Sequence, residues 1–256
     1  MRTILPLFAC LALACSGSDD KDDTTTDAAD TDTDTDADTD TDTDTDTDTD
    51  TDTDPNRTAV DFELVDLLTT NPVEGMDLTV DGDSATTDAD GLAGLTVTLD
   101  ADYEVVGSHP DYYDHIWVGY GGVPHVMASN MLSRTGGGLI ASLLGVDIDP
   151  AKGVVVVTIE DPAGNNIEGT TVTPDLAFDV ALVPDDTQTS GFAAGQTTLP
   201  ANTSWVIFVN LDPGDVMMSI TPADTGLSCY FAGGGPVADW AVSKADSVTN
   251  MSVICE

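Results

Sequence analysis

Basic side chains are scarce in this sequence. Six Lys and Arg residues stand against 47 Asp and Glu residues, and the 256-residue chain has a formal net charge of −41. Residues 55–256 alone hold 29 acidic and only 4 basic residues, so the acidic excess is not confined to the N-terminal part. Because a field of this sign repels phosphate backbones, we expect no binding of nucleic acid.

Long hydrophobic runs are absent after the first fifteen residues. A transmembrane helix needs about 20 consecutive apolar residues, and no later segment approaches that length. The mostly apolar stretch 3–14, which follows Met1 and Arg2, is too short to span a bilayer and is typical of an export signal. We therefore expect an exported protein without a membrane-spanning helix.

The export signal ends in "LALACSGS". A basic start, an apolar run, a small residue and then a cysteine resemble the lipobox of bacterial lipoprotein signal peptides. The resemblance implies a signal of residues 1–15 with lipidation at Cys15, and Ser16 after it favours release to the outer membrane. Cys10, which follows "LFA", is a competing site, and ordinary signal-peptide cleavage is the alternative. The expected location is the bacterial outer membrane or cell surface, with the lipid as membrane anchor.

Residues 16–55 form a Thr/Asp-rich tract without hydrophobic periodicity. From residue 30 to residue 54 every even position is Asp, and every odd position is Thr except Ala37. Such a segment cannot bury enough apolar surface to offset its conformational entropy, and its charges repel one another. We expect a disordered, extended spacer that reaches at most on the order of 130 Å. Weak calcium binding by the Asp row and glycosylation of the threonines are the alternatives.

Cysteine is also rare, with four residues in the chain, two of them in the export signal. In an exported protein the remaining pair, Cys229 and Cys255, is most simply a disulfide that closes the C-terminal strand onto its domain. The loop-entropy relation gives such a link a contribution of about 3.5 kcal/mol. Two free thiols are the alternative.

The part of the chain after the tract contains an internal repeat. "VDFELVDLLTTNPVEG" (60–75) aligns without a gap on "VVVVTIEDPAGNNIEG" (154–169), and residues 86–110 align on 197–222 with one residue of slip. Short alternating strands with turn residues every 8 to 12 positions indicate antiparallel β-sandwiches. We therefore expect a mainly β fold with two tandem antiparallel β-sandwich domains, 56–150 and 151–256.

The alternation also predicts two separate cores. The first contains Phe62, Leu78, Leu95, Val97 and Leu99, and the second contains Ile159, Val172, Trp205, Ile207, Val209 and Met218. Between the copies, 124–135 and 139–145 are predicted to be short helices broken by the glycines 136–138. This helical insertion belongs to the first domain, and residues 116–150 are expected to have no counterpart in the second.

The repeated motifs resemble the carboxypeptidase regulatory-like domain. The resemblance rests on "TTDADGLAGLTVTLDADYEVVGSHPDYY" in the first copy and "FVNLDPGDVMMSI" in the second. It implies a small prealbumin-like β-sandwich that serves as an accessory or binding module. It supplies no catalytic residues to transfer to this chain.

The most aromatic segment of the chain is "HPDYYDHIWVGYGGVPH". Binding surfaces favour such residues, so we predict a binding surface here, formed by His109, Asp111, Tyr112, Tyr113, His115, Trp117 and Tyr120. The same segment invites a zinc interpretation through its three histidines (His109, His115 and His125), together with Asp111 and Asp114. Their spacing matches no zinc motif, and a structural loop is the simpler interpretation.

A second candidate is the stretch "DGDSATTDADG". Its carboxylates are calcium ligands by type, and they belong to Asp81, Asp83, Asp88 and Asp90. The stretch lacks the twelfth-position Glu and the flanking helices of an EF-hand, and a plain hairpin turn is the simpler interpretation. We expect no other cofactor and no enzyme activity, because the sequence contains no catalytic motif.

These features together predict a non-catalytic, surface-tethered lipoprotein that presents tandem β-sandwich modules. Its role is either the binding of a protein or carbohydrate ligand or a structural role in the cell envelope. An accessory subunit of an exported hydrolase and a calcium-dependent adhesion module are the alternatives.

Overall fold

The computed structural model describes residues 54–185, 187 and 191–256, which belong to one compact unit. The predicted export signal, its Cys15 and residues 16–53 of the tract lie outside the described residues. The expectations of lipidation and of a disordered spacer therefore stay predictions.

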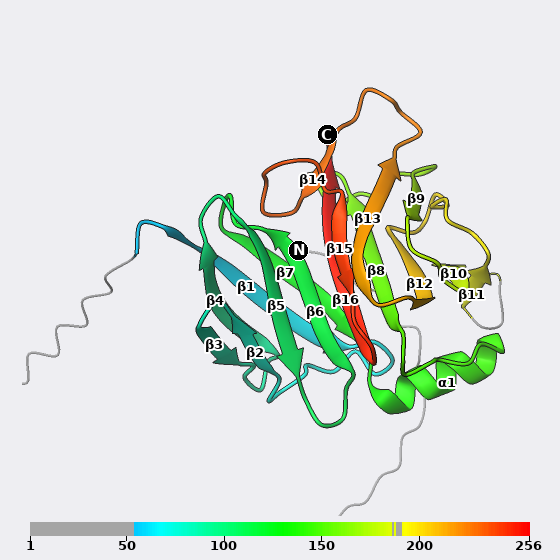
Figure 1. Ribbon diagram of the computed structural model, residues 1–256, viewed down its shortest axis with the longest axis horizontal. Helices are drawn as coiled ribbons and strands as arrows, with labels where there is room; N and C mark the ends of the chain where they lie inside the picture. The colour runs from blue at the N-terminus through cyan, green and yellow to red at the C-terminus, as the bar shows by residue number, and fades with distance from the viewer. Residues whose placement is uncertain (1–53, 186, 188–190) are drawn as a thin grey trace, which may run out of the picture. The chain divides into compact units, whose positions relative to one another are not determined.

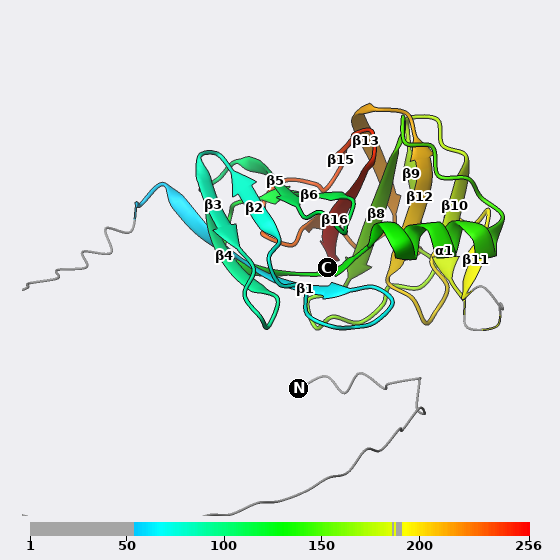
Figure 2. The same cartoon turned by 90° about the horizontal axis from the view of Figure 1, so that it is seen from below.

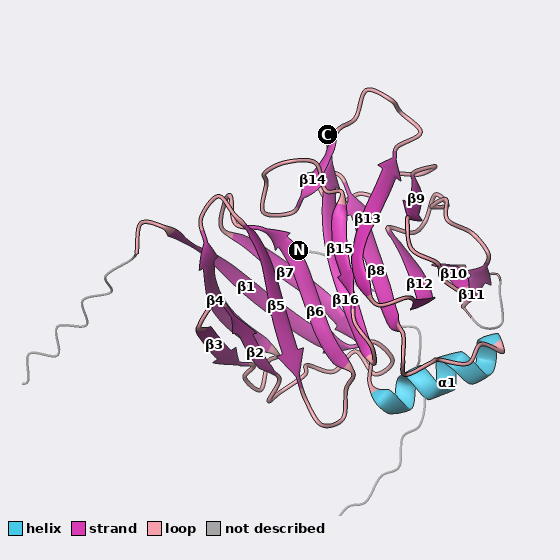
Figure 3. Cartoon of the chain, viewed as in Figure 1, coloured by secondary structure: helices cyan, strands magenta, loops and turns pink. Residues whose placement is uncertain are grey.

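The described residues form sixteen strands and a single helix (Figures 1 and 3), which confirms the mainly β fold. The first half contains β1 (Arg57–Asp66), β2 (Asp77–Val80), β3 (Asp83–Thr86), β4 (Leu92–Thr98), β5 (Asp102–Ser108), β6 (Asp114–Tyr120), β7 (His125–Met131) and α1 (Arg134–Leu144). The second half contains β8 (Gly153–Glu160), β9 (Thr171–Pro174), β10 (Val180–Pro184), β11 (Phe192–Ala194), β12 (Trp205–Leu211), β13 (Gly214–Thr221), β14 (Cys229–Phe231), β15 (Trp240–Ser243) and β16 (Ser247–Cys255).

The first half folds as a sandwich of two sheet layers. One layer has the strand order β4-β1-β7 and the other continues as β6-β5-β2-β3. Side chains of both layers meet in one buried cluster, which includes Phe62 from β1, Leu78 from β2, Val97 from β4 and Met127 from β7. The alternating burial of β1 along its length places this core on one face of the strand.

The second half repeats this strand pairing. β8 pairs antiparallel with β12 and parallel with β16, as β1 pairs with β4 and with β7. β13 pairs with β9 and β15, as β5 pairs with β2 and β6. The strands β10, β11 and β14 are additional to this shared set. The internal repeat seen in the sequence is therefore a repeat of topology.

The repeat is not aligned without a gap, which corrects the expected register. Phe62 faces the first core, and its counterpart by burial is Val157 rather than Val156. The two copies return to register at Gly75 and Gly169, whose φ angles are +81° and +77°. The turn between these points is one residue shorter in the second copy. Because a shift of one residue exchanges the two faces of a strand, burial decides the alignment.

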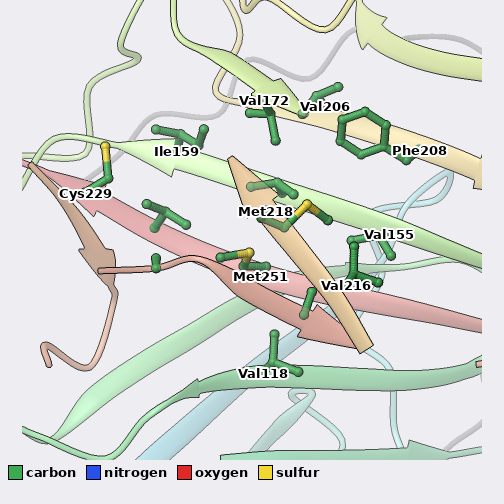
Figure 4. Packing of buried hydrophobic residues seen from close by; sticks show 14 of the residues in the cluster. Val118, Val155, Ile159, Val172, Val206, Phe208, Val216, Met218, Cys229 and Met251 are labelled. Carbon is green, nitrogen blue, oxygen red and sulfur yellow. The ribbon is translucent and has the colours of Figure 1, made fainter. Parts of the chain in front are cut away.

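The two copies meet where β16 pairs in parallel with β6. This pairing joins the larger sheet of the second copy to the second layer of the first, so one sheet runs from β11 to β3. β6 also serves two cores: Trp117 packs in the first, whereas Ile116 and Val118 pack in the second. Figure 4 shows Val118 pointing toward Val216 and Met251. The division into domains 56–150 and 151–256 stays a prediction.

Most of the predicted core positions are buried. In the first core only Leu99 is not buried: it lies after the end of β4 and is 36% exposed. In the second, Ile159, Val172 and Met218 are buried as expected. Ile207 and Val209 instead lie on the opposite face of the sheet, where they pack with Leu144. Trp205 is half-buried. β12 is thus apolar on both faces because both faces are covered.

The segment between the copies corrects the helical prediction. Residues 125–131, expected in a helix, form strand β7, which pairs with β1 and corresponds to β16. The glycines 136–138, expected to break a helix, lie inside α1, which crosses β8 and β12 in Figure 2. Ser133 caps its N-terminus, and Gly145 ends it with a φ of +65°. Among the described residues, no helix has the length and apolar character needed to cross a membrane.

Candidate binding surface

The predicted aromatic surface divides into an outer and an inner part. His109 and Tyr112 lie before β6 and contact each other edge to face, with ring centroids 5.1 Å apart. Tyr113 lies under the guanidinium of Arg134, whose central carbon is 5.0 Å from the ring centroid. These side chains are half-buried, Tyr120 is also half-buried and Asp111 is exposed. The outer part is therefore accessible to a partner.

The inner part consists of His115 and Trp117, both of which are fully buried. Trp117 packs edge to face on Phe62 at 5.2 Å between centroids, and its Nε1–H donates to Ser129 Oγ at 2.8 Å. The aromatic composition that indicated a binding surface is here explained by core packing. These two residues build the interior and not a surface.

His115 lies at the β6–β16 seam between the two copies. The backbone N–H of Leu132 donates to its Nε2 at 3.1 Å. The side-chain nitrogen Nδ2 of Asn250 lies 3.1 Å from Nδ1. Burial lowers the pKa of His115 to about 3. The ring is therefore a neutral structural link.

A second histidine link was not predicted from the sequence. The Tyr103 hydroxyl lies 2.7 Å from His125 Nε2, and His125 Nδ1 lies 2.9 Å from the carbonyl of Val123. Burial raises the pKa of Tyr103 and lowers that of His125, on which the Val123 hydrogen bond and the Asp61 charge act in the opposite direction. The alternating burial of β5 turns Tyr103 inward, but no local signal in the sequence identifies its partner.

The three histidines considered for zinc do not converge. His115 is enclosed at the seam, His125 is bonded to Tyr103, and His109 contacts Tyr112. In the described part of the chain, no group of three or more His, Cys, Asp or Glu side chains is placed to hold a metal ion.

The predicted calcium carboxylates are spread along the β2–β4 region. Asp83 Oδ2 accepts hydrogen bonds from the backbone N–H of Thr96 at 2.9 Å and from its hydroxyl at 2.8 Å. These bonds, with a smaller opposing effect of burial, lower the pKa of Asp83. Asp88 Oδ1 accepts from the backbone N–H groups of Asp90 and Leu92. Asp83 thus links β3 to β4 and Asp88 holds the turn between them, whereas Asp81 lies at the β2–β3 turn with a φ of +42°.

A related role belongs to Asp66, at the end of β1. Its Oδ1 accepts from the backbone N–H groups of Leu68 and Thr69, at 3.0 and 2.8 Å. Burial acts to raise the pKa of Asp66, but these hydrogen bonds outweigh it and the pKa is lowered. Burial and the neighbouring Asp66 charge raise the pKa of Tyr112 to about 12. The Asp66 carboxylate therefore stabilises the turn that follows β1.

The part of the chain after the tract is strongly negative because acidic residues outnumber basic ones, and its few cations are paired. Each basic residue of 55–256 forms an ion pair with a carboxylate: Arg57 with Asp83, Arg134 with Asp246, Lys152 with Asp179 and Asp212, and Lys244 with Glu104. Two of these pairs, Arg134–Asp246 and Lys244–Glu104, join the first copy to the second. The 29 acidic residues of 55–256 outnumber the 4 basic ones, so the net charge attracts cationic partners.

The predicted disulfide is confirmed. Cys229 of β14 is bonded to Cys255 of β16, and the two residues are directly opposite in the antiparallel register. The bond lies wholly within the second copy, and it fixes β14 against the C-terminal strand.

No family model matches the sequence, and no curated protein matches it. Among solved structures, the Bacillus anthracis TIE protein aligns with 78% of this chain and 34% of its own, at 13% identity and a TM-score of 0.25. A streptococcal ancillary pilin aligns with 78% of this chain and 63% of its own, also at 13% identity and a TM-score of 0.25.

The shaft pilin SpaA from Lactobacillus rhamnosus GG aligns with 78% of this chain and 98% of its own, at 9% identity and a TM-score of 0.24. The chain thus spans about a third of the length of the TIE protein and less than two thirds of the ancillary pilin. At these TM-scores the chains do not superpose as wholes. The assignment of this protein as a β-sandwich protein therefore rests on its own strand order and shared cores.

Proposed function

We propose that this protein is a non-catalytic, exported module that Cys15 tethers to the membrane through a lipid. The observation that carries the proposal is the use of its reactive side chains as structural links. His115 joins the seam, His125 is bonded to Tyr103, Asp66 holds a turn and Asp83 links β3 to β4. Groups engaged in this way stabilise one rigid fold that presents a surface.

We also propose roles for the two copies and for the tract. The two copies act as tandem domains, 56–150 and 151–256, of the prealbumin-like carboxypeptidase regulatory-like type. The tract 16–55 serves as a spacer, and the outer membrane or cell surface is the location. The role is the binding of a protein or carbohydrate, or a structural role in the envelope, and the accessible aromatic residues near His109 and Tyr113 support binding.

The tether is tested with Cys15→Ser in the native bacterium. Wild-type protein is expected in the detergent-rich phase after phase partitioning, and the variant in the aqueous phase, because the lipid is the proposed anchor. Cys10→Ser is the matched control and should partition like the wild type. Protease added to intact cells should degrade the wild type. A Cys15→Ser protein that stays in the detergent phase would contradict the proposal.

A further inference from the structure

Strand β7 is an open edge of the first sandwich. It pairs only with β1, at the end of the sheet β4-β1-β7. Among the edge strands of the described residues, β7 and β4 are the longest, with seven residues each. An edge strand presents a row of unpaired N–H and C=O groups and is a template for another strand.

The hydrogen bonds at the end of β7 identify which of its residues face outward. The Met131 carbonyl accepts from Leu67 at the end of β1, so the backbone of Met131 faces β1. Leu132, the next residue, faces away, because its N–H donates to His115 and its carbonyl accepts from Tyr113. Since successive residues of a strand alternate, the backbone groups of Asn130, Ala128 and Val126 also point outward. All three residues are exposed, and Val126 is 58% exposed.

This edge lacks the usual protection against pairing. The sequence of β7, "HVMASNM", contains no Lys, Arg, Asp or Glu. By contrast, the outward N–H of Thr96 on β4 is bonded to the Asp83 carboxylate. Beside β15, the N–H of Ala238 is bonded to the Cys229 carbonyl of β14. Within the described residues, β7 is therefore the long edge strand whose outward backbone is left open.

The second copy shows what this edge accepts. β16 corresponds to β7: both run parallel to the first strand of their copy, and the buried Met251 and Met127 occupy matching positions. The outer edge of β16 is covered by β6 over Ser247–Met251 and by β14 over Val253–Cys255. The same edge in the first copy has no strand beside it among the described residues. The fold therefore accommodates a parallel strand at this position.

Charge identifies the occupant. Asp61 and Glu63 of β1 are exposed and lie opposite Val126 and Ala128. A strand added beside β7 would lie about 10 Å from β1, two strand spacings away. A long cationic side chain on that strand and the Glu63 side chain could meet over the small Ala128. A second copy of this chain would bring a net charge of −25 from residues 55–256 and is disfavoured.

We infer that the outer edge of β7, at Val126, Ala128 and Asn130, binds an extended segment of a partner protein that carries Lys or Arg, and that this segment adds as a parallel strand. Backbone hydrogen bonds would supply the affinity, and the carboxylates of Asp61 and Glu63 the preference for cations. The inference rests on the proposed function, since it names the class of partner that the module binds.

The test uses the full chain and a fluorescein-labelled peptide of eight alternating Lys and Val residues, read by fluorescence anisotropy. Ala128→Pro removes one outward N–H and leaves every charge in place, and an outward edge position tolerates proline. Ala128→Ser is the matched control, which keeps the N–H. We expect at least tenfold weaker binding for Ala128→Pro, less than twofold change for Ala128→Ser, and no binding of a Glu–Val peptide. Equal binding by wild type and Ala128→Pro would overturn the inference.

Hydrogen exchange on the wild-type protein tests peptide binding at the edge of β7 even if Ala128→Pro does not fold. The peptide should slow exchange of the alternate amides of Val126, Ala128 and Asn130, whereas attraction to the acidic surface or tract alone would leave them unchanged. Unchanged exchange overturns the inference. The inference is also overturned if these amides are protected without peptide and the protection grows with protein concentration, because the occupant is then a second copy. Neither outcome depends on lipidation, so the proposed tether is tested separately.

Discussion

At the scale of single residues, His115 shows how a polar side chain can belong to a core. Its ring is stacked on Trp117 with centroids 5.8 Å apart, and of its two nitrogen partners Leu132 belongs to the same copy and Asn250 lies across the seam. The sequence placed His115 in a binding or metal site because histidine and aromatic residues are typical of both. Its actual partners, Leu132 and Asn250, lie 17 and 135 residues away along the chain, and no local pattern identifies them.

The buried, neutral His115 predicts a specific pH dependence of stability. Its folded pKa of about 3 lies below the ordinary value of 6.5, so between these values the unfolded chain binds one more proton than the folded chain. The free energy of unfolding should therefore be independent of this group above pH 6.5 and should fall by up to about 1.4 kcal/mol per pH unit as the pH decreases toward 3. Urea unfolding of wild type and His115→Gln between pH 4.5 and 7 measures this effect.

The variant is expected to show the shallower pH dependence, because it removes this proton uptake. Since His125 also has a lowered pKa and is present in both proteins, the difference between the two slopes reports His115. Identical slopes would mean that His115 is protonated or solvated in the folded state.

At the scale of elements, the period-two pattern predicted the strands well where one face meets a core and the other meets water. β1 and β4 follow this alternation closely. β7 does so less clearly, since "HVMASNM" carries no charged residue on its outer face, and a helix was expected there. The glycines of α1 were predicted to break a helix, but tertiary packing overrides their low helix propensity. The residues Gly136 and Gly137 are buried, where a side chain would not fit.

The glycines of α1 provide a matched pair of substitutions. A Cβ at Gly138 would meet nothing within 4 Å, whereas a Cβ at Gly137 would lie 2.7 Å from the Tyr113 ring. We expect Gly138→Ala to raise the free energy of unfolding by about 0.5–1 kcal/mol, because alanine favours the helix. We expect Gly137→Ala to lower it, since the Tyr113 ring, held under Arg134, must move. Chemical denaturation of the two variants measures both effects, and stabilisation by Gly137→Ala would contradict the assigned packing.

At the scale of the whole described unit, the repeat and the presence of two cores could be predicted from the sequence, but their junction could not. β6 contains the unbroken apolar run "IWV", which was interpreted as part of an aromatic surface. In the structure, its two faces supply two cores, and its free edge receives β16. An apolar run indicates burial on both faces but not which segments cover them. The β6–β16 pairing therefore required the structure.

This junction predicts that the second copy depends on the first for its stability. A piece consisting of residues 151–256 retains the disulfide but loses Ile116 and Val118 from its core, together with the strand beside Ser247–Met251 of β16. Removing a buried Ile side chain alone costs about 2–5 kcal/mol, which is a large part of the stability of a small domain. We therefore expect the piece 151–256 to be unfolded or to melt far below the full chain, as measured by circular dichroism.

A longer piece, residues 112–256, restores β6 and should recover part of the lost stability. This recovery separates the contribution of β6 from that of the remaining first copy. A piece 151–256 that melts at the temperature of the full chain would show that the second copy folds alone and that the sharing of β6 between the cores contributes little.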